Sequence, residues 1–157
     1  VQEELAHGSI TRVPGVGVYL ASPAEDVPAA LSSQIKVLHA MPANIVVVTV
    51  VTDTVPYVDG EPEMVTVMPR VDRMTIHVGY MQTADIPTTV RKHLLGERER
   101  GATYYLSERR FVASDAGEVG ETRERIFAFL HKNSQAPGAY FNLPVDRVIS
   151  IGTRVDL

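Results

Sequence analysis

The sequence contains no cysteine among its 157 residues. A disulfide framework and thiolate chemistry are therefore excluded. Metal binding is also not indicated by the histidines, because no two of them lie within four residues of each other. They are His7, His39, His77, His93 and His131. We therefore expect neither a bound metal nor another cofactor.

An excess of basic charge and long apolar runs are also lacking. The formal net charge of −4 argues against a nucleic-acid-binding protein, which would carry a basic face. No apolar run reaches the roughly 18 residues that a membrane span needs; the longest, 45–51, has the length of a strand. The first residues resemble no signal peptide and include no initiator methionine, so we expect a piece of a longer or processed protein. What remains, 45% hydrophobic, suits one domain with a sizeable core.

A complete glycine-rich phosphate loop is missing as well. Gly15 and Gly17 stand one residue apart, but the third glycine position of the nucleotide fingerprint is Leu20. The two glycines also precede an apolar strand, whereas the fingerprint follows one. We interpret Pro14 and Gly15 as a turn and Gly17 as a place of close backbone packing.

Apolar residues at helical spacing follow this first strand. They are Val27, Leu31, Ile35 and Leu38. Two starts for the helix compete: Ser22 with Glu25 forms a capping box, and Asp26 is an equally good cap. Pro42 is expected to end the helix.

The remaining patterns alternate between strands and helices. Residues 44–54, rich in Ile and Val on both faces, are typical of a central strand in a parallel sheet. The other expected elements are a strand at 17–21 after a connector, an antiparallel hairpin over 65–81 turning at 71–73, a helix capped by Asp85 and closed by Gly96, a strand at 103–107, a helix at 121–134 and a strand at 146–157. This order predicts an α/β fold: a single mostly parallel sheet with an antiparallel hairpin, and helices packed on it.

Six stretches, in order, resemble the cytosolic C-terminal domain of the KUP/HAK/KT potassium uptake transporters. They are RVPGVGVYLAS (12–22), VLHAMPANIVVVTVVTDTVP (37–56), VGYMQTADIP (78–87), TYYLSERRFVAS (103–114), RERIFAFLHKNS (123–134) and YFNLPVDRVISIGTRVDL (140–157). Two places depart from the family pattern: residues 31–37 look shorter and less basic, and Gln82 stands where an acidic residue is common.

The resemblance implies a role for the whole protein. Potassium uptake, with proton symport, would occur in a membrane bundle outside this chain, so no residue here is a transport residue. Residues 1–11 would connect to that transmembrane portion, and 12–157 would form a regulatory and structural domain on the cytoplasmic face of the cell membrane. The resemblance also implies a homodimer and, as in some family members, a cyclic dinucleotide ligand such as cyclic di-AMP.

Candidate ligand-binding residues follow three of the expected strands. They are Ser22, Thr52, Asp53, Ser107, Arg109 and Arg110. Ligands of open α/β sheets bind beyond the carboxyl ends of the strands, and arginine forks suit phosphate. The alternatives are a turn at 52–53 that only satisfies backbone groups, and a solvated charge cluster at 107–110.

Other function classes stay open at this point. The local sequence suggests neither a Ser-His-Asp set nor paired carboxylates, so we expect no enzyme, although triads also assemble from distant residues. A free-standing soluble nucleotide-binding α/β protein is the alternative to a transporter domain, and a small hydrolase is a third. Leftover apolar residues, such as Phe127, Val65 and Val67, are candidates for an isologous dimer contact.

Overall fold

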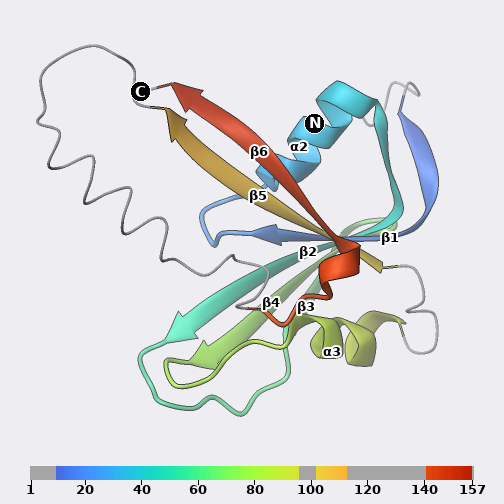
Figure 1. Ribbon diagram of the computed structural model, residues 1–157. Helices are drawn as coiled ribbons and strands as arrows, with labels where there is room; N and C mark the ends of the chain where they lie inside the picture. Colours follow the sequence, from blue (N-terminus) through green and yellow to red (C-terminus); the bar gives the residue numbers. More distant parts are fainter. Residues whose placement is uncertain (1–9, 96–101, 113–140, 157) are drawn as a thin grey trace, which may run out of the picture.

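The computed structural model describes residues 10–95, 102–112 and 141–156. Its centre is a six-stranded sheet in the order β3-β4-β2-β1-β5-β6, which Figure 1 shows as a twisted fan. The strands are β1 (Thr11–Ala21), β2 (Ala40–Asp53), β3 (Glu63–Met68), β4 (Val71–Gly79), β5 (Ala102–Val112) and β6 (Val148–Asp156). Only the β3–β4 pair is antiparallel, so the predicted α/β fold with a mostly parallel sheet is confirmed.

The order of the strands reverses in the middle of the sheet. From β1 the chain moves to β2 and β4 on one side, and then crosses to β5 and β6 on the other. The boundary between β1 and β5 is therefore the topological switch point, beside which α/β sheets form their crevices.

The two faces of the sheet are packed by different helices, α2 (Ala29–Leu38) and α3 (Ile86–Val90), the latter continued by a π-helical turn over Arg91–Leu95. On the α2 face, Leu31 and Ile35 of the helix pack with Tyr19 and Val47 of the sheet. The α3 face buries a second cluster, which includes Val18, Val46, Val48, Met74, Ile86 and Val90. Side chains of a strand alternate between faces, so each strand position belongs to one cluster or the other.

The first strand is longer than its apolar run predicts. β1 begins at Thr11 rather than residue 17, because the preceding residues pair with the start of β2. Pro14 and Gly15 form no turn between elements; they lie at a register irregularity within β1, where Gly15 adopts a φ of 129°. The close packing predicted at Gly17 is confirmed, since a Cβ there would lie 2.5 Å from Cγ of Pro42.

Helix α2 begins and ends at other residues than predicted. It ends before His39, whose left-handed conformation (φ 48°) turns the chain directly into β2. Pro42 lies inside β2 and does not end the helix. Neither expected N-cap is used: Ser22 and Glu25 form a separate turn, and Asp26 makes no capping bond to the helix.

The later elements agree with their patterns except at the boundaries. The hairpin is antiparallel as predicted, but it turns at Pro69 and Arg70, which frees residues 71–73 to start β4. Asp85 caps α3 as predicted, its Oδ1 accepting from the amide of Thr88 at 3.1 Å. The predicted helix 121–134 and the predicted end at Gly96 lie outside the described residues.

Candidate functional site

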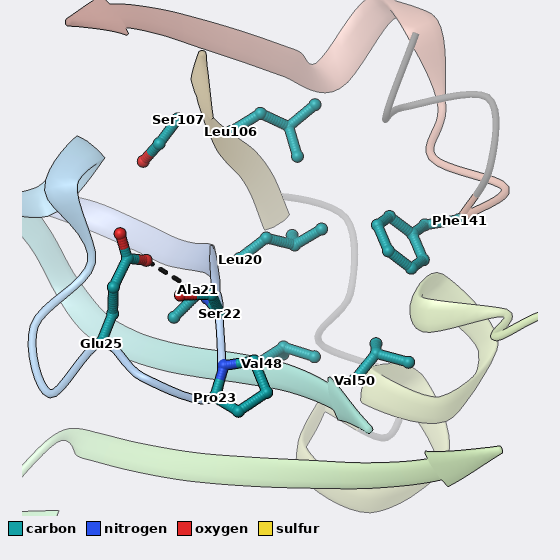
Figure 2. A pocket seen from close by; sticks show the side chains of 10 residues that line it. All are labelled: Leu20, Ala21, Ser22, Pro23, Glu25, Val48, Val50, Leu106, Ser107 and Phe141. Carbon is teal, nitrogen blue, oxygen red and sulfur yellow. Dashed lines mark hydrogen bonds between the residues drawn. The ribbon is translucent and has the colours of Figure 1, made fainter. Parts of the chain in front are cut away.

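A cavity opens at the switch point of the sheet. Its volume is about 440 Å³, within the range of small-molecule sites. The residues that line it are Leu20, Ala21, Ser22, Pro23, Glu25, Val48, Val50, Leu106, Ser107 and Phe141. Figure 2 shows these side chains around an open space beyond the end of β1. The cavity therefore lies where a doubly wound α/β sheet binds ligands.

The floor of the cavity is apolar. Leu20, Val48, Val50 and Leu106 come from β1, β2 and β5, and all four belong to the α3 face of the sheet. The ring of Phe141 stands at one side of the same space (Figure 2). Aliphatic side chains facing an aromatic ring can bury a flat, weakly polar group such as a heterocyclic base.

The rim of the cavity is polar and carries one acidic group. The amide of Ser22 donates to Oε2 of Glu25 at 3.2 Å, and the amide of Glu25 donates to the carbonyl of Ser22 at 3.0 Å. These bonds fix the turn that follows β1. Glu25 is the charged residue among those that line the cavity, so this part of the rim repels an anionic group.

Ser107 connects the cavity wall to helix α2. Its Oγ accepts a hydrogen bond from the amide of Ala30 at 2.9 Å. The donor is one of the first amides of α2, whose own N-cap position, Pro28, makes no side-chain capping bond. A hydroxyl from β5 thus accepts the hydrogen bond that an N-cap side chain would otherwise accept. Ser107 does not end a strand as predicted, because β5 continues to Val112 in a parallel pair with β6.

The predicted pair Thr52 and Asp53 lies apart from the cavity. Strand alternation places Asp53 on the α2 face, together with Val47, whereas the apolar floor of the cavity belongs to the α3 face, and Asp53 is not among the lining residues. The carboxylate oxygens of Asp53 lie 3.2 and 3.3 Å from Nδ1 of His77 in β4. Thr52 is exposed near the end of β2 and does not line the cavity. The structure therefore brings Ser22 and Ser107 together, and separates Asp53 from them.

The two candidate arginines lie farther along β5. Arg109 and Arg110 pair with Thr153 and Arg154 of β6 in the backbone ladder. Their side chains lie outside the described part of the structure. Two or three strand residues beyond Ser107 correspond to about 7–10 Å along β5.

Gln82 has a structural part in this edge of the sheet. Its Oε1 accepts from the amides of Gly79 at 2.7 Å and Val58 at 2.8 Å, while its Nε2 donates to the carbonyl of Val58 at 3.1 Å. The side chain thereby fastens the loop after β2 to the end of β4. A glutamate would lose the amide donor of this contact, which explains why glutamine suits this position.

Sequence reasoning missed most of the cavity. The apolar runs predicted that Leu20, Val48 and Val50 would be buried, but no pattern predicted a space between them. Phe141 precedes β6 in the chain and joins the lining only through the fold. In the described ranges, no group of three metal-ligating side chains gathers.

Comparison with known proteins yields one family. The family model "K+ potassium transporter C-terminal domain" matches residues 14–157. The relatives include the probable potassium transport system protein Kup of Erythrobacter litoralis, 32% identical over 96% of this chain, and those of Nitrosomonas eutropha and Pseudomonas aeruginosa PAO1, each 34% identical over 93%. The chain spans about a quarter of their length (25%, 24% and 24%). No solved structure matches significantly.

The helices were also compared with the requirements of a membrane span. In the described ranges, none is long and apolar enough to cross a bilayer.

Proposed function

Because the chain belongs to the K+ potassium transporter C-terminal domain family, we propose that it is the cytoplasmic regulatory domain of a potassium uptake transporter. Residues 1–11 would connect it to a transmembrane portion that carries out proton-coupled potassium transport, and 12–157 would form the domain. The relatives named for potassium transport, each about four times as long as the region matched, support this proposal. They also favour it over a free-standing nucleotide-binding protein.

The regulatory ligand that we propose is a cyclic dinucleotide such as cyclic di-AMP, bound in the cavity. The observation that carries this proposal is an apolar cavity of about 440 Å³ at the switch point of the sheet. One purine base would lie between the aliphatic floor and the ring of Phe141. Ser22, at the rim, would offer hydrogen-bonding groups to the base edge or the ribose.

The charge at the rim decides how the ligand would be oriented. The carboxylate of Glu25 repels phosphate, so the two phosphates must point away from it. Among the residues that line the cavity, none has a basic side chain that would bind the phosphates. Arg109 and Arg110 come two and three residues after Ser107 in β5, nearer the carboxyl end of that strand. Because side chains alternate along a strand, one of the two guanidinium groups would hold the phosphates through bidentate bonds.

Calorimetric titration of the 157-residue chain with cyclic di-AMP tests this proposal. Two variants should weaken binding: Phe141→Ala, which removes the ring, and the double variant Arg109→Ala with Arg110→Ala, which removes both guanidinium groups that could hold the phosphates. Asp53→Ala is the matched control, because Asp53 lies on the other face of the sheet and should leave binding unchanged. A separate titration with ATP tests the alternative of a general nucleotide-binding protein. We expect neither nucleotide to be hydrolysed.

Two results would contradict the ligand proposal. One is the absence of binding heat with cyclic di-AMP at concentrations far above those of a regulatory ligand. The other is binding that Phe141→Ala leaves intact and Asp53→Ala abolishes, which would move the ligand to the α2 face.

We propose further that the domain forms a homodimer. Val65 and Val67 of the edge strand β3 are 59% and 50% exposed, and an isologous contact would cover them. Light scattering should show a dimer for the wild type and a monomer for Val67→Asp. A wild-type monomer at high concentration would contradict the proposal.

A further inference from the structure

The first halves of β1 and β2 project beyond the rest of the sheet. Among the described strands, β4 joins β2 only from Ile45 onward, and β5 joins β1 only from Val16 onward. Residues 11–15 and 40–44 therefore form a two-stranded ribbon of their own. Figure 1 shows it rising from the sheet toward the end of α2. All five residues of its β1 side are exposed.

The last turn of α2 lies against the end of this ribbon. The amide of Thr11 donates to the carbonyl of His39, the C-cap of the helix, at 2.8 Å. Val37 and Leu38 in that turn are 74% and 64% exposed, and Val13 on the ribbon is 49% exposed. The last turn of α2 and the ribbon thus carry three exposed aliphatic side chains.

The same two segments carry two exposed basic side chains. Lys36 is exposed in the last turn of α2, and Arg12 is exposed on the ribbon, where its Nη1 also donates to the carbonyl of Ala43 at 3.2 Å. We call Arg12, Val13, Lys36, Val37 and Leu38 the ribbon surface. It has a formal charge of +2 and no acidic member, although the whole chain carries −4.

The ribbon surface also lies where the described chain begins. The family matched is a C-terminal domain, and the chain spans only 24–25% of its relatives, so on the proposed function the membrane portion precedes β1. The ribbon would then be the part of the domain next to the bilayer. Exposed aliphatic side chains mixed with lysine and arginine suit the boundary between headgroups and acyl chains of an anionic leaflet.

We propose that the ribbon surface docks on anionic lipid headgroups of the membrane to which the domain is attached. Leu38, Val37 and Val13 enter the interface, while Lys36 and Arg12 lie at the phosphates. Each basic residue contributes about fivefold to such binding. A weak contact suffices, because the covalent attachment supplies an effective concentration in the millimolar range.

The chain offers a direct test, since it contains no tryptophan. Leu38→Trp places a sole tryptophan on the ribbon surface, and Met81→Trp places one at a site of similar exposure (62%) beyond the opposite end of β4. Each variant of the full chain is titrated with vesicles of mixed phosphatidylglycerol and phosphatidylcholine, and with phosphatidylcholine alone, up to millimolar lipid. We expect a blue shift of the emission only for Leu38→Trp, only with phosphatidylglycerol, and reduced by salt.

A second comparison isolates the charges. In the Leu38→Trp background, Lys36→Gln should weaken vesicle binding about fivefold. Lys92→Gln should leave it unchanged, because Lys92 pairs with Glu61 away from the ribbon surface. No shift for Leu38→Trp, or equal shifts at both tryptophan sites, would overturn the proposal and leave a protein partner for this surface. The vesicle titration contains no nucleotide, so a negative result would leave the cyclic dinucleotide proposal unaffected. A negative result in the calorimetry would likewise leave the lipid proposal unaffected.

Discussion

Replacing Tyr19 by phenylalanine should destabilise the domain through a single buried oxygen. Tyr19 is fully buried, and its hydroxyl donates to Oε1 of Gln34 in α2 at 2.6 Å. Its ring stacks on that of Tyr105, with centroids 4.4 Å apart and planes 7° apart. Tyr19→Phe keeps the stacked ring but leaves the amide oxygen of Gln34, itself 8% exposed, without its donor. An unsatisfied buried acceptor costs about 1–3 kcal/mol, so the free energy of unfolding should fall by that amount.

The assay is urea denaturation of the 157-residue chain followed by far-ultraviolet circular dichroism. A fall of about 2 kcal/mol corresponds to a Tm about 4–8 °C lower for a domain of this size. The double variant Tyr19→Phe with Gln34→Leu removes both polar groups and should recover part of the loss. A neutral Tyr19→Phe would refute the reasoning, as would a double variant whose loss is the sum of the two single losses.

Further outcomes follow from other contacts. Burial raises the pKa of the Tyr19 hydroxyl in the folded state, while the unfolded tyrosine ionises near pH 10. The stability that the hydroxyl contributes should therefore be lost as the pH rises above about 10. Urea titrations should show the difference in free energy of unfolding between the wild type and Tyr19→Phe becoming smaller there. Ser107→Ala removes the acceptor at the start of α2 and should lower the free energy of unfolding by about 1 kcal/mol, as measured by denaturation. Gly79→Ala should lower the Tm strongly, because its Cβ would clash with the backbone carbonyl of Pro56. Gly60→Ala should not, because its Cβ would make only an ordinary contact, 3.9 Å from Cγ1 of Val58. Equal effects at the two glycines would contradict the packing argument.

The kind and order of the elements were predictable because they depend on local periodicity. The apolar run of 44–54 predicted a central parallel strand, and β2 does lie between β1 and β4. Asp85 predicted the start of α3 because its capping acceptor and donor are three residues apart. In these cases the physical cause lies within a few residues of its effect.

The boundaries that were wrong depend on partners that are distant in sequence. β1 starts at Thr11 because it pairs with Ala40, and β5 runs to Val112 because β6 continues beside it. Neither extension is apolar enough to be predicted from its own residues. Helix α2 lacks a local cap because Ser107, 77 residues away, accepts from its amide.

The placement of the candidate site residues was only partly predictable, because it also depends on residues that are distant in sequence. The rule that ligands bind beyond the carboxyl ends of parallel strands suggested Ser22, which lines the cavity. The rule says nothing about faces, and a shift of one residue along a strand reverses the face. Asp53 follows Val48 by five residues, an odd number, and therefore contacts His77 on the α2 face rather than the cavity. Strand ends alone locate an edge of the sheet. The parity of a position decides its face, but only the folded structure shows which positions line one cavity: Ser107 accepts from α2 on one face and still lines the cavity at the edge.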